Sequence, residues 1–344
     1  MTTRLFHFKF TAPLHIANVR ADYDRSETTL SSDTLYAAVM SAWAMLGKSE
    51  WITPEPAFAL SSLFPYYYKK YEQVRYFLPK PTGVLKTKDQ DIHKKIKKVR
   101  YIEAGLFAKW AKGMAMEEAD TNCLAGDFYL EKPLNDEQRE VIKNFVASEV
   151  YPRVRVPRVE KKDADPYYIE RIWFAEGSGL YCLFVGSEED YRKVKTALNF
   201  LQYEGIGTDR HVGNGLFTLE ESALPESFRF DVAGATHWVN LSLFCPESAE
   251  QLESLLPEAD SHIAYELVQR GGWITTEPFL TLRKKHVYML REGSVFANSS
   301  TSIQVEANLG IAGKTHNVRP EWNDDRLHPV YRCGRAIFVP VKMN

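Results

Sequence analysis

A glycine-rich segment with an adjacent arginine and histidine is the part of this sequence best suited to ligand chemistry. Residues 205–217 read GIGTDRHVGNGLF and contain four glycines, Gly205, Gly207, Gly213 and Gly215. Because glycine lacks a Cβ, another backbone can approach the main-chain N–H groups of such a segment closely. Arg210 can donate two hydrogen bonds to a phosphate, and His211 can stack on a base or bind a phosphate. The segment predicts either a phosphate-binding loop or a tight connection with solvated polar side chains.

The order of the flanking elements disfavours a nucleotide-binding fold. The dinucleotide fingerprint G-x-G-x-x-G follows a strand and opens a helix. Here the helical spacing of Tyr191, Val194, Leu198 and Leu201 lies before the glycines, and the apolar residues 216–219 predict a strand after them. The phosphate-loop motif G-x-x-x-x-G-K-[ST] does not occur in the sequence. The glycine segment is therefore expected to join the end of a helix to a strand.

Catalytic and metal-binding motifs are missing from the sequence. It contains no G-x-S-x-G, no H-E-x-x-H and no H-x-E with a C-x-x-C, and its four cysteines are far apart. We therefore predict no catalytic residue, no metal site and no cofactor. The alternative is a metal-independent RNase in which His15 and His211 serve as general acid and base, since histidine titrates near neutral pH. Taken alone, His15 is equally well read as an interior histidine.

Further candidates for contacts with phosphates are spread along the chain. The start of a helix near Asp33 offers backbone N–H groups suited to an anion, although serines there can also act as helix caps. Flanking prolines fix the direction of the lysine in LPKP, and RKK at 283–285 is a short basic run that also suits a plain surface. The candidate RNA-binding residues outside the glycine segment are His15, Arg20, Arg25, Ser31, Ser32, Lys80, Arg283 and Lys284.

Charge is distributed unevenly along the 344 residues, whose formal net charge is −2. Residues 80–100 contain eight Lys/Arg against two Asp, and residues 151–162 contain five Lys/Arg against one Glu. Residues 216–260 contain one Arg against nine acidic residues. A nucleic acid must therefore bind to local basic patches, and we expect one basic and one acidic face. Without a signal-peptide core or an apolar run of about 18 residues, the chain is expected to be cytoplasmic with no membrane partner.

The predicted elements suggest two α+β domains. Phe6, Phe8 and Phe10 alternate with His7 and Lys9, which predicts a half-buried strand. A helix at 31–47, extended segments at 60–81, a strand at 179–186, a helix at 191–202 and the strand at 216 follow. Without a long insertion at 83–178, this order is β-α-β-β-α-β, the ferredoxin-like or RRM-like arrangement. We expect one such domain over 1–222 and a second, less regular one over 223–344.

Several of these stretches together resemble the RAMP superfamily of CRISPR proteins, and within it the fourth subunit of the type III-A (Csm) effector complex. They are TAPLHIAN, SETTLSSDTLYAAV, SSLFPYYYKK, YFLPKP, GIGTDRHVGNGLF and RKKHVYMLREGSVF. Ala17 and Thr208 occupy positions where the family often has glycine, and the insertion carries no resemblance.

The resemblance implies two ferredoxin-like domains with a Gly-rich loop before the last strand. It also implies a non-catalytic scaffold that caps the complex and holds the 5′ repeat-derived handle of the CRISPR guide RNA. The implied protein partners are the large polymerase-bearing subunit and an adjacent backbone RAMP subunit. A purely structural adaptor that never touches RNA is a further alternative.

Overall fold

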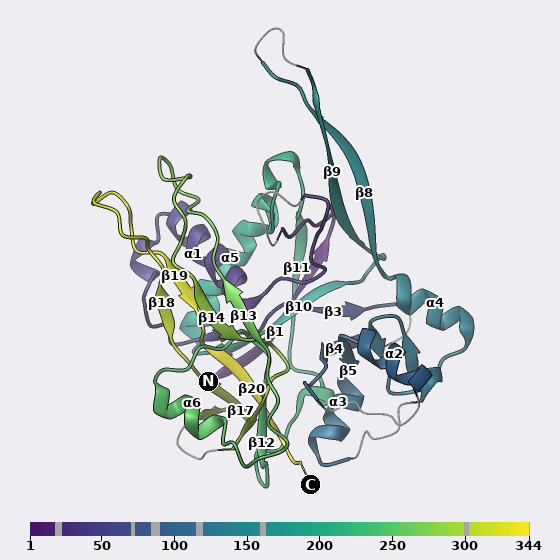
Figure 1. The fold of residues 1–344 in the computed structure, drawn as a ribbon. Coiled ribbons are helices and arrows are strands. Elements are labelled where there is room, and N and C mark those ends of the chain that lie inside the picture. The colour runs from purple at the N-terminus through teal and green to yellow at the C-terminus, as the bar shows by residue number, and fades with distance from the viewer. Residues whose placement is uncertain are drawn as a thin grey trace.

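The computed structural model describes residues 1–17, 23–69, 73–83, 90–114, 120–158, 163–298 and 303–343. The protein is of the α+β class, with sheets dominating and few helices (Figure 1), as the sequence predicted. Within the described residues, no helix is both long enough and apolar enough to cross a membrane.

The largest sheet has nine strands, in the order β11-β1-β10-β3-β4-β5-β7-β6, with β2 also pairing with β10. All neighbours are antiparallel except β5 and β7, which run parallel. The strands are β1 (Thr2–Phe10), β2 (Ala59–Leu60), β3 (Phe64–Tyr67), β4 (Arg75–Pro79), β5 (Tyr101–Glu103), β6 (Leu124–Ala125), β7 (Phe128–Tyr129), β10 (Gly179–Gly186) and β11 (Phe217–Ser222).

Two helices cover one face of this sheet, and both were predicted from the sequence. Helix α1 (Ser32–Met45) follows β1 and buries Leu35, Val39 and Trp43, and Gly47 ends it with a φ of 70°. Helix α5 (Glu188–Glu204) joins β10 to β11 and begins where Ser187 Oγ accepts a hydrogen bond from the Asp190 N–H at 3.0 Å. Helices α1 and α5 and the adjacent strands β11, β1, β10 and β3 agree with the predicted β-α-β-β-α-β order, and a ferredoxin-like domain over residues 1–222 remains a prediction.

Strand β1 is buried on both faces, so the prediction of a half-buried strand was wrong. Phe6 and Phe8 pack under α1 and α5, whereas Leu5 belongs to the core on the opposite face. His7 is only 7% exposed, and its Nε2 lies 2.9 Å from the Tyr76 hydroxyl. The second half of the chain covers this opposite face, and sequence alternation within β1 alone cannot reveal that layer.

The first part of segment 83–178, predicted as an insertion, extends the main sheet through β5, β7 and β6. The tilted rings of Phe77, Phe128 and Phe145 pack together there, and the Phe128 centroid lies 4.6 Å from that of Phe77 and 5.0 Å from that of Phe145. Its helices are α2 (Gln90–Lys98), α3 (Ala104–Ala111), η2 (Thr121–Cys123) and α4 (Asp136–Asn144). The second part is a long hairpin of β8 (Val146–Arg155) and β9 (Asp165–Phe174) that projects from the body of the protein (Figure 1).

The second half of the chain forms a five-stranded sheet in the order β15-β12-β20-β17-β16 and two short hairpins, β13–β14 and β18–β19. Its strands are β12 (His237–Asn240), β13 (Leu267–Arg270), β14 (Val287–Leu290), β15 (Val295–Ala297), β16 (Gln304–Glu306), β17 (Leu309–Ala312), β18 (Thr315–Asn317), β19 (Tyr331–Cys333) and β20 (Ala336–Val341). Of the described residues after 232, only Ala249–Leu255 form an α-helix, α6. Short 3-10 turns occur at η1 (Ser49–Trp51), η3 (Arg210–Val212) and η4 (Glu226–Phe228). Two ferredoxin-like domains, divided at 222, remain a prediction.

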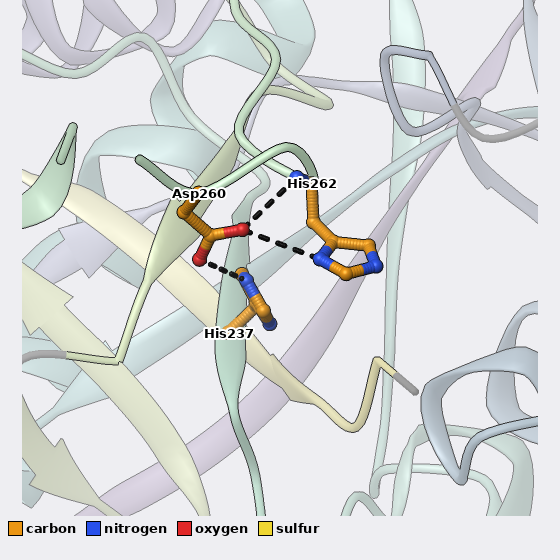
Figure 2. A group of neighbouring side chains, drawn as sticks. All are labelled: His237, Asp260 and His262. Carbon is orange, nitrogen blue, oxygen red and sulfur yellow. Dashed lines mark hydrogen bonds and ion pairs between the residues drawn. The ribbon is translucent and has the colours of Figure 1, made fainter. Parts of the chain in front are cut away.

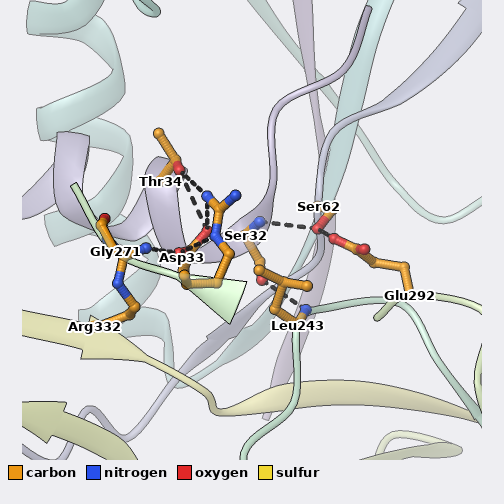
Figure 3. A network of polar contacts seen from close by, with 9 residues as sticks. Ser32, Asp33, Thr34, Ser62, Leu243, Gly271, Glu292 and Arg332 are labelled. Atoms are coloured by element: carbon orange, nitrogen blue, oxygen red, sulfur yellow. Dashed lines mark hydrogen bonds and ion pairs between the residues drawn. The ribbon is translucent and has the colours of Figure 1, made fainter. Parts of the chain in front are cut away.

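The two halves share one core and a polar seam. Leu183 and Val185 of the first sheet lie in the same apolar cluster as Val239 and Val339 of the second. At the seam, Ser32 Oγ accepts a hydrogen bond from the Leu243 N–H at 2.9 Å (Figure 3). Contacts of this kind fix how the halves sit on each other, because both partners are buried and need a hydrogen bond.

Candidate nucleic-acid interface

The glycine segment forms a closed loop between α5 and β11, as the sequence predicted. The Ile206 N–H donates to the Gly215 carbonyl at 3.0 Å. A Cβ on Gly215 would lie 1.9 Å from the Ile206 carbonyl oxygen, and one on Gly205 would lie 2.6 Å from that of Asn214. Both glycines are buried and have positive φ. Gly205 and Gly215 therefore shape the loop, and their direct contact with RNA remains a prediction.

This loop is fastened to the segment that follows β1. Thr208 N–H donates to the His15 carbonyl at 2.8 Å, and Gly215 N–H donates to the Pro13 carbonyl at 2.8 Å. A Cβ on Gly207 would approach the His15 carbonyl oxygen to 2.5 Å. Two stretches almost 200 residues apart in sequence, both singled out above, thus lie side by side.

The outer part of the loop is open to solvent. Asp209 and Gly213 adopt left-handed conformations, with φ of 55° and 85°, and bracket the single turn η3. Arg210, His211 and Gly213 are exposed, and a Cβ on Gly213 would meet nothing within 4 Å. The side chains of Arg210 and His211 form no hydrogen bond or ion pair with the other described residues. This turn is the part of the loop that can receive a ligand.

His15 is fully buried in this structure, and its contact with RNA remains a prediction. Its exposure is 0%, and Nδ1 lies 2.7 Å from the carbonyl oxygen of Glu170 on β9. Its Nε2 has no hydrogen-bond partner among the described residues. The side chain therefore ties the loop region to the hairpin. The interior-histidine reading that the sequence left open is the one that the structure supports.

A row of aromatic rings leads from this region onto the hairpin. The His15 and Tyr23 rings stack with centroids 6.3 Å apart, and the Tyr23 and Tyr167 centroids are 5.7 Å apart. The Arg155 guanidinium lies 5.8 Å from the Tyr167 ring centroid, and Tyr168 is 58% exposed. Arginine next to partly exposed aromatic rings is a suitable surface for single-stranded nucleic acid, because bases stack on rings and phosphates pair with the cation.

Sequence analysis missed the aromatic residues of this surface. The charge count identified 151–162 as basic, but it did not show that Arg153 and Arg155 lie on a hairpin beside the glycine loop. Tyr23 and Tyr167 are separated by more than 140 residues, and neither has a motif around it. Only the pairing of β8 with β9 and the contact of β9 with residues 14–26 bring them together.

The start of α1 does not offer the anion site that the sequence suggested. Ser32 is 4% exposed, and its N–H donates to Ser62 Oγ at 2.8 Å. Asp33 is 1% exposed and paired with Arg270 and Arg332 (Figure 3). Burial alone would raise the pKa of Asp33, but these two guanidinium groups lower it below its ordinary value. Ser32 is therefore buried and already hydrogen-bonded, and Ser31 is half-buried at the N-cap. Contact of either serine with RNA remains a prediction.

The remaining candidates lie in different places. Arg25 is exposed next to Tyr23, whereas Arg20 lies outside the described residues. Lys80 donates to the Ile96 carbonyl at 3.2 Å, at the end of β4. Arg283 lies 4.8 Å from the Trp273 ring centroid, in the loop between β13 and β14. Burial, together with the nearby Arg332 charge, lowers the pKa of Lys284 to about 8. Contact of these residues with RNA remains a prediction.

Comparison with known proteins supports the resemblance seen in the sequence. A family model described as the CRISPR Csm4 C-terminal domain matches residues 233–341. The protein named "CRISPR system Cms protein Csm4" from Mycobacterium tuberculosis H37Rv is 26% identical over 347 residues, which cover 98% of each chain. The protein of the same name from Streptococcus thermophilus is 25% identical over 329 residues, covering 93% of each.

Solved structures show the same fold along almost the whole chain. One chain of a Csm3-Csm4 subcomplex of the type III-A interference complex matches with a TM-score of 0.62 and 18% identity, covering 99% of this chain and 100% of that one. One chain of a Csm1-Csm4 cassette in complex with cA4 matches with a TM-score of 0.58 and 18% identity, covering 99% and 98%. The chain is therefore Csm4-like along almost its whole length, as its sequence motifs predicted.

Proposed function

We propose that this protein is a non-catalytic, RNA-binding scaffold subunit of a type III-A CRISPR interference complex, and that it holds the 5′ repeat-derived handle of the guide RNA. The proposal of a complex subunit rests on the relatives named Csm4 and on the solved Csm3-Csm4 and Csm1-Csm4 assemblies. By analogy, its partners are a Csm3-like backbone subunit and the large, polymerase-bearing Csm1-like subunit.

The observation that carries the RNA proposal is the convergence of the glycine loop, the segment after β1 and the base of the hairpin. A backbone hydrogen bond holds Thr208 against His15, and the His15 side chain bonds to the Glu170 carbonyl. The surface above this junction presents Arg210, His211 and the aromatic row that ends at Arg155. It combines cations, stacking rings and an open glycine, which are the groups that a single strand requires.

The chemistry assigns a role to each group. Arg210 pairs with a phosphate through its guanidinium fork, and the open backbone at Gly213 lets the sugar–phosphate chain approach. On the hairpin, the half-buried ring of Tyr167 can stack with a base, and Arg155, which lies next to the hairpin turn, can pair with a phosphate farther along the strand. Recognition of this kind uses the backbone and base stacking, and it suits a handle that lies unpaired on the protein.

Burial of His15 disfavours the alternative of an RNase that uses His15 and His211. General acid–base cleavage requires both groups within about 3 Å of the atoms that exchange protons. His15 is 0% exposed, whereas His211 is exposed on the outer turn of the loop. The two imidazoles therefore face different environments, and no RNA atom can reach His15 without opening the loop.

Fluorescence anisotropy with a labelled 5′-handle RNA tests the binding proposal. Compared with wild type, an Arg210→Gln/His211→Gln variant is expected to bind at least tenfold more weakly, because it loses one cation and one stacking or hydrogen-bonding ring. Arg229→Gln is the matched control, since Arg229 is 70% exposed within the acidic stretch. Equal affinities for wild type and both variants would contradict the proposal.

Single-turnover incubation of labelled repeat RNA with excess protein tests the non-catalytic part. The RNA is expected to stay intact with and without divalent metal. Site-specific cleavage that disappears in His211→Gln would overturn the scaffold assignment in favour of the RNase. Co-purification from a host carrying the complete CRISPR locus tests the partners, and recovery of this chain without any other subunit or guide RNA would contradict the assignment to a complex.

A further inference from the structure

A second group of chemically active side chains lies in the C-terminal half, away from the glycine loop. His237 on β12 and the turn residues Asp260 and His262 place three ligand atoms within 4.8 Å of one another. Figure 2 shows the Asp260 carboxylate between the two imidazole rings. Among the described residues, this is the one group of three or more His, Cys, Asp or Glu side chains with such spacing. The proposed function uses the glycine loop but gives this group of three side chains no role.

We propose that His237, Asp260 and His262 bind a divalent transition-metal ion of the Zn²⁺ class. Two imidazoles and a carboxylate are a donor set that Zn²⁺ accepts, with metal–ligand distances of about 2.0–2.2 Å. Tetrahedral ligands at those distances are separated by about 3.3 Å. The His237 Nε2–Asp260 Oδ2 distance is 2.8 Å and the His262 Nδ1–Asp260 Oδ1 distance is 3.2 Å, so the ligand atoms need only small adjustments.

Hydrogen bonds around His237 direct one ring nitrogen toward this group. Its Nδ1 lies 2.8 Å from Thr236 Oγ1. Thr236 Oγ1 also accepts a hydrogen bond from the Met343 N–H at 2.8 Å, which fixes the position of the hydroxyl beside the ring. Whichever of the two groups donates, this contact holds the ring with Nε2 2.8 Å from Asp260 Oδ2, and with Nδ1 protonated Nε2 presents its lone pair to a cation. Second-sphere partners of this kind orient metal-binding histidines in known sites.

The carboxylate is positioned by its own turn. Asp260 Oδ1 accepts a hydrogen bond from the His262 N–H at 2.9 Å, which leaves Oδ2 directed at His237. The side chain of His237 is 7% exposed, that of Asp260 is 25% exposed and that of His262 is 41% exposed. The site therefore has a buried side and an open side, and three protein ligands leave one position for water. An ion bound here would link the turn after α6 to His237, the first residue of β12.

Zinc titration of the untagged, full-length protein against a chromophoric chelator tests the site. Wild type is expected to bind one Zn²⁺ per chain, and His262→Gln and Asp260→Asn are each expected to bind at least tenfold more weakly. His262 is exposed, so its variant should keep the wild-type circular dichroism spectrum. His328→Gln is the matched control, because His328 is exposed and bonded to Thr276 at 2.9 Å.

X-ray absorption on the zinc-loaded protein provides a second readout. It should show nitrogen and oxygen neighbours at about 2.0–2.1 Å and no sulfur. Absence of stoichiometric binding by wild type would overturn the proposal and leave the group as a hydrogen-bonded turn. Equal affinity in wild type and His262→Gln, or sulfur in the coordination shell, would overturn it as well. None of these results depends on RNA, so the metal proposal and the proposed function can fail separately.

Discussion

Arg270 donates two hydrogen bonds to the buried carboxylate of Asp33, from Nε to Oδ2 and from Nη2 to Oδ1, each 2.9 Å long. Asp33 belongs to the first turn of α1 and Arg270 to β13, so the bidentate pair joins the two halves of the chain. Arg332 on β19 also bonds to Asp33 and donates to the Gly271 carbonyl at 2.6 Å. Two arginines, one from each short hairpin of the second half, thus neutralise the buried carboxylate at the start of α1.

Asp33→Asn is expected to destabilise the protein by about 3–5 kcal/mol, because it leaves two buried guanidinium groups without a counter-charge. Urea unfolding followed by tryptophan fluorescence measures this. Asp136→Asn is the control, since the Asp136 side chain is 94% exposed and its pair with Arg139 should contribute less than about 1 kcal/mol. Similar losses in the two variants would contradict a structural role for the seam.

The contribution of Asp33 to the free energy of unfolding should depend on pH. Its folded-state pKa is lowered by Arg270 and Arg332 despite burial, so the unfolded state takes up the proton first as pH falls. The contribution is complete above the unfolded pKa of about 3.9 and is lost as pH falls from there through the folded pKa. The stability difference between wild type and Asp33→Asn should therefore shrink below about pH 4. A constant difference from pH 6 to pH 3 would refute this assignment.

Lys284 should destabilise the protein at neutral pH. Burial and the neighbouring Arg332 charge lower its pKa to about 8, so folding disfavours its protonated form. The penalty is complete below about pH 8 and disappears as pH rises toward the unfolded value of about 10.4. Lys284→Met should be more stable than wild type at pH 7, with a smaller gain at pH 9. Lys285→Met is the exposed control and should show no such trend.

Two glycines of one loop should respond differently to alanine. In Gly215→Ala the new Cβ would lie 1.9 Å from the Ile206 carbonyl oxygen, so we expect a loss above about 4 kcal/mol or failure to fold. Gly213→Ala has open space around the Cβ and only the cost of a φ of 85°, about 1–2 kcal/mol. Thermal unfolding of both variants checks this order. Equal losses of stability in the two variants would show that Gly215 does not lie against the Ile206 carbonyl as described.

Handle binding should weaken steeply with salt. The net charge is −2, so affinity must come from local cations that displace counterions from the RNA. For a single strand, each phosphate contact contributes about −0.7 to the slope of log affinity against log salt. Arg210→Gln should make the slope less steep by about that amount, and Arg229→Gln should leave it unchanged. A salt-independent affinity would exclude the electrostatic mechanism.

Local sequence determined the elements and the loop at the centre of the candidate interface. Helical spacing defined α1 and α5, and the position of the glycines between α5 and an apolar strand predicted a connection of this type. These features can be predicted from the sequence because capping, periodicity and glycine conformation depend on a few neighbouring residues. The combination of motifs also sufficed to predict the family.

Tertiary structure decided which of those residues face solvent and which distant ones meet. In the sequence, His7 lies on the polar side of an alternating strand and His15 can be read either as an interior histidine or as an RNA contact, and layers supplied by distant segments bury both. Asp33 reads as a helix cap, yet it pairs with arginines more than 230 residues away. The approach of His237 to Asp260 and His262 follows from the β12 register and the turn after α6, and no spacing rule connects them. Long-range packing creates these contacts, because each depends on the faces that two elements bury against each other.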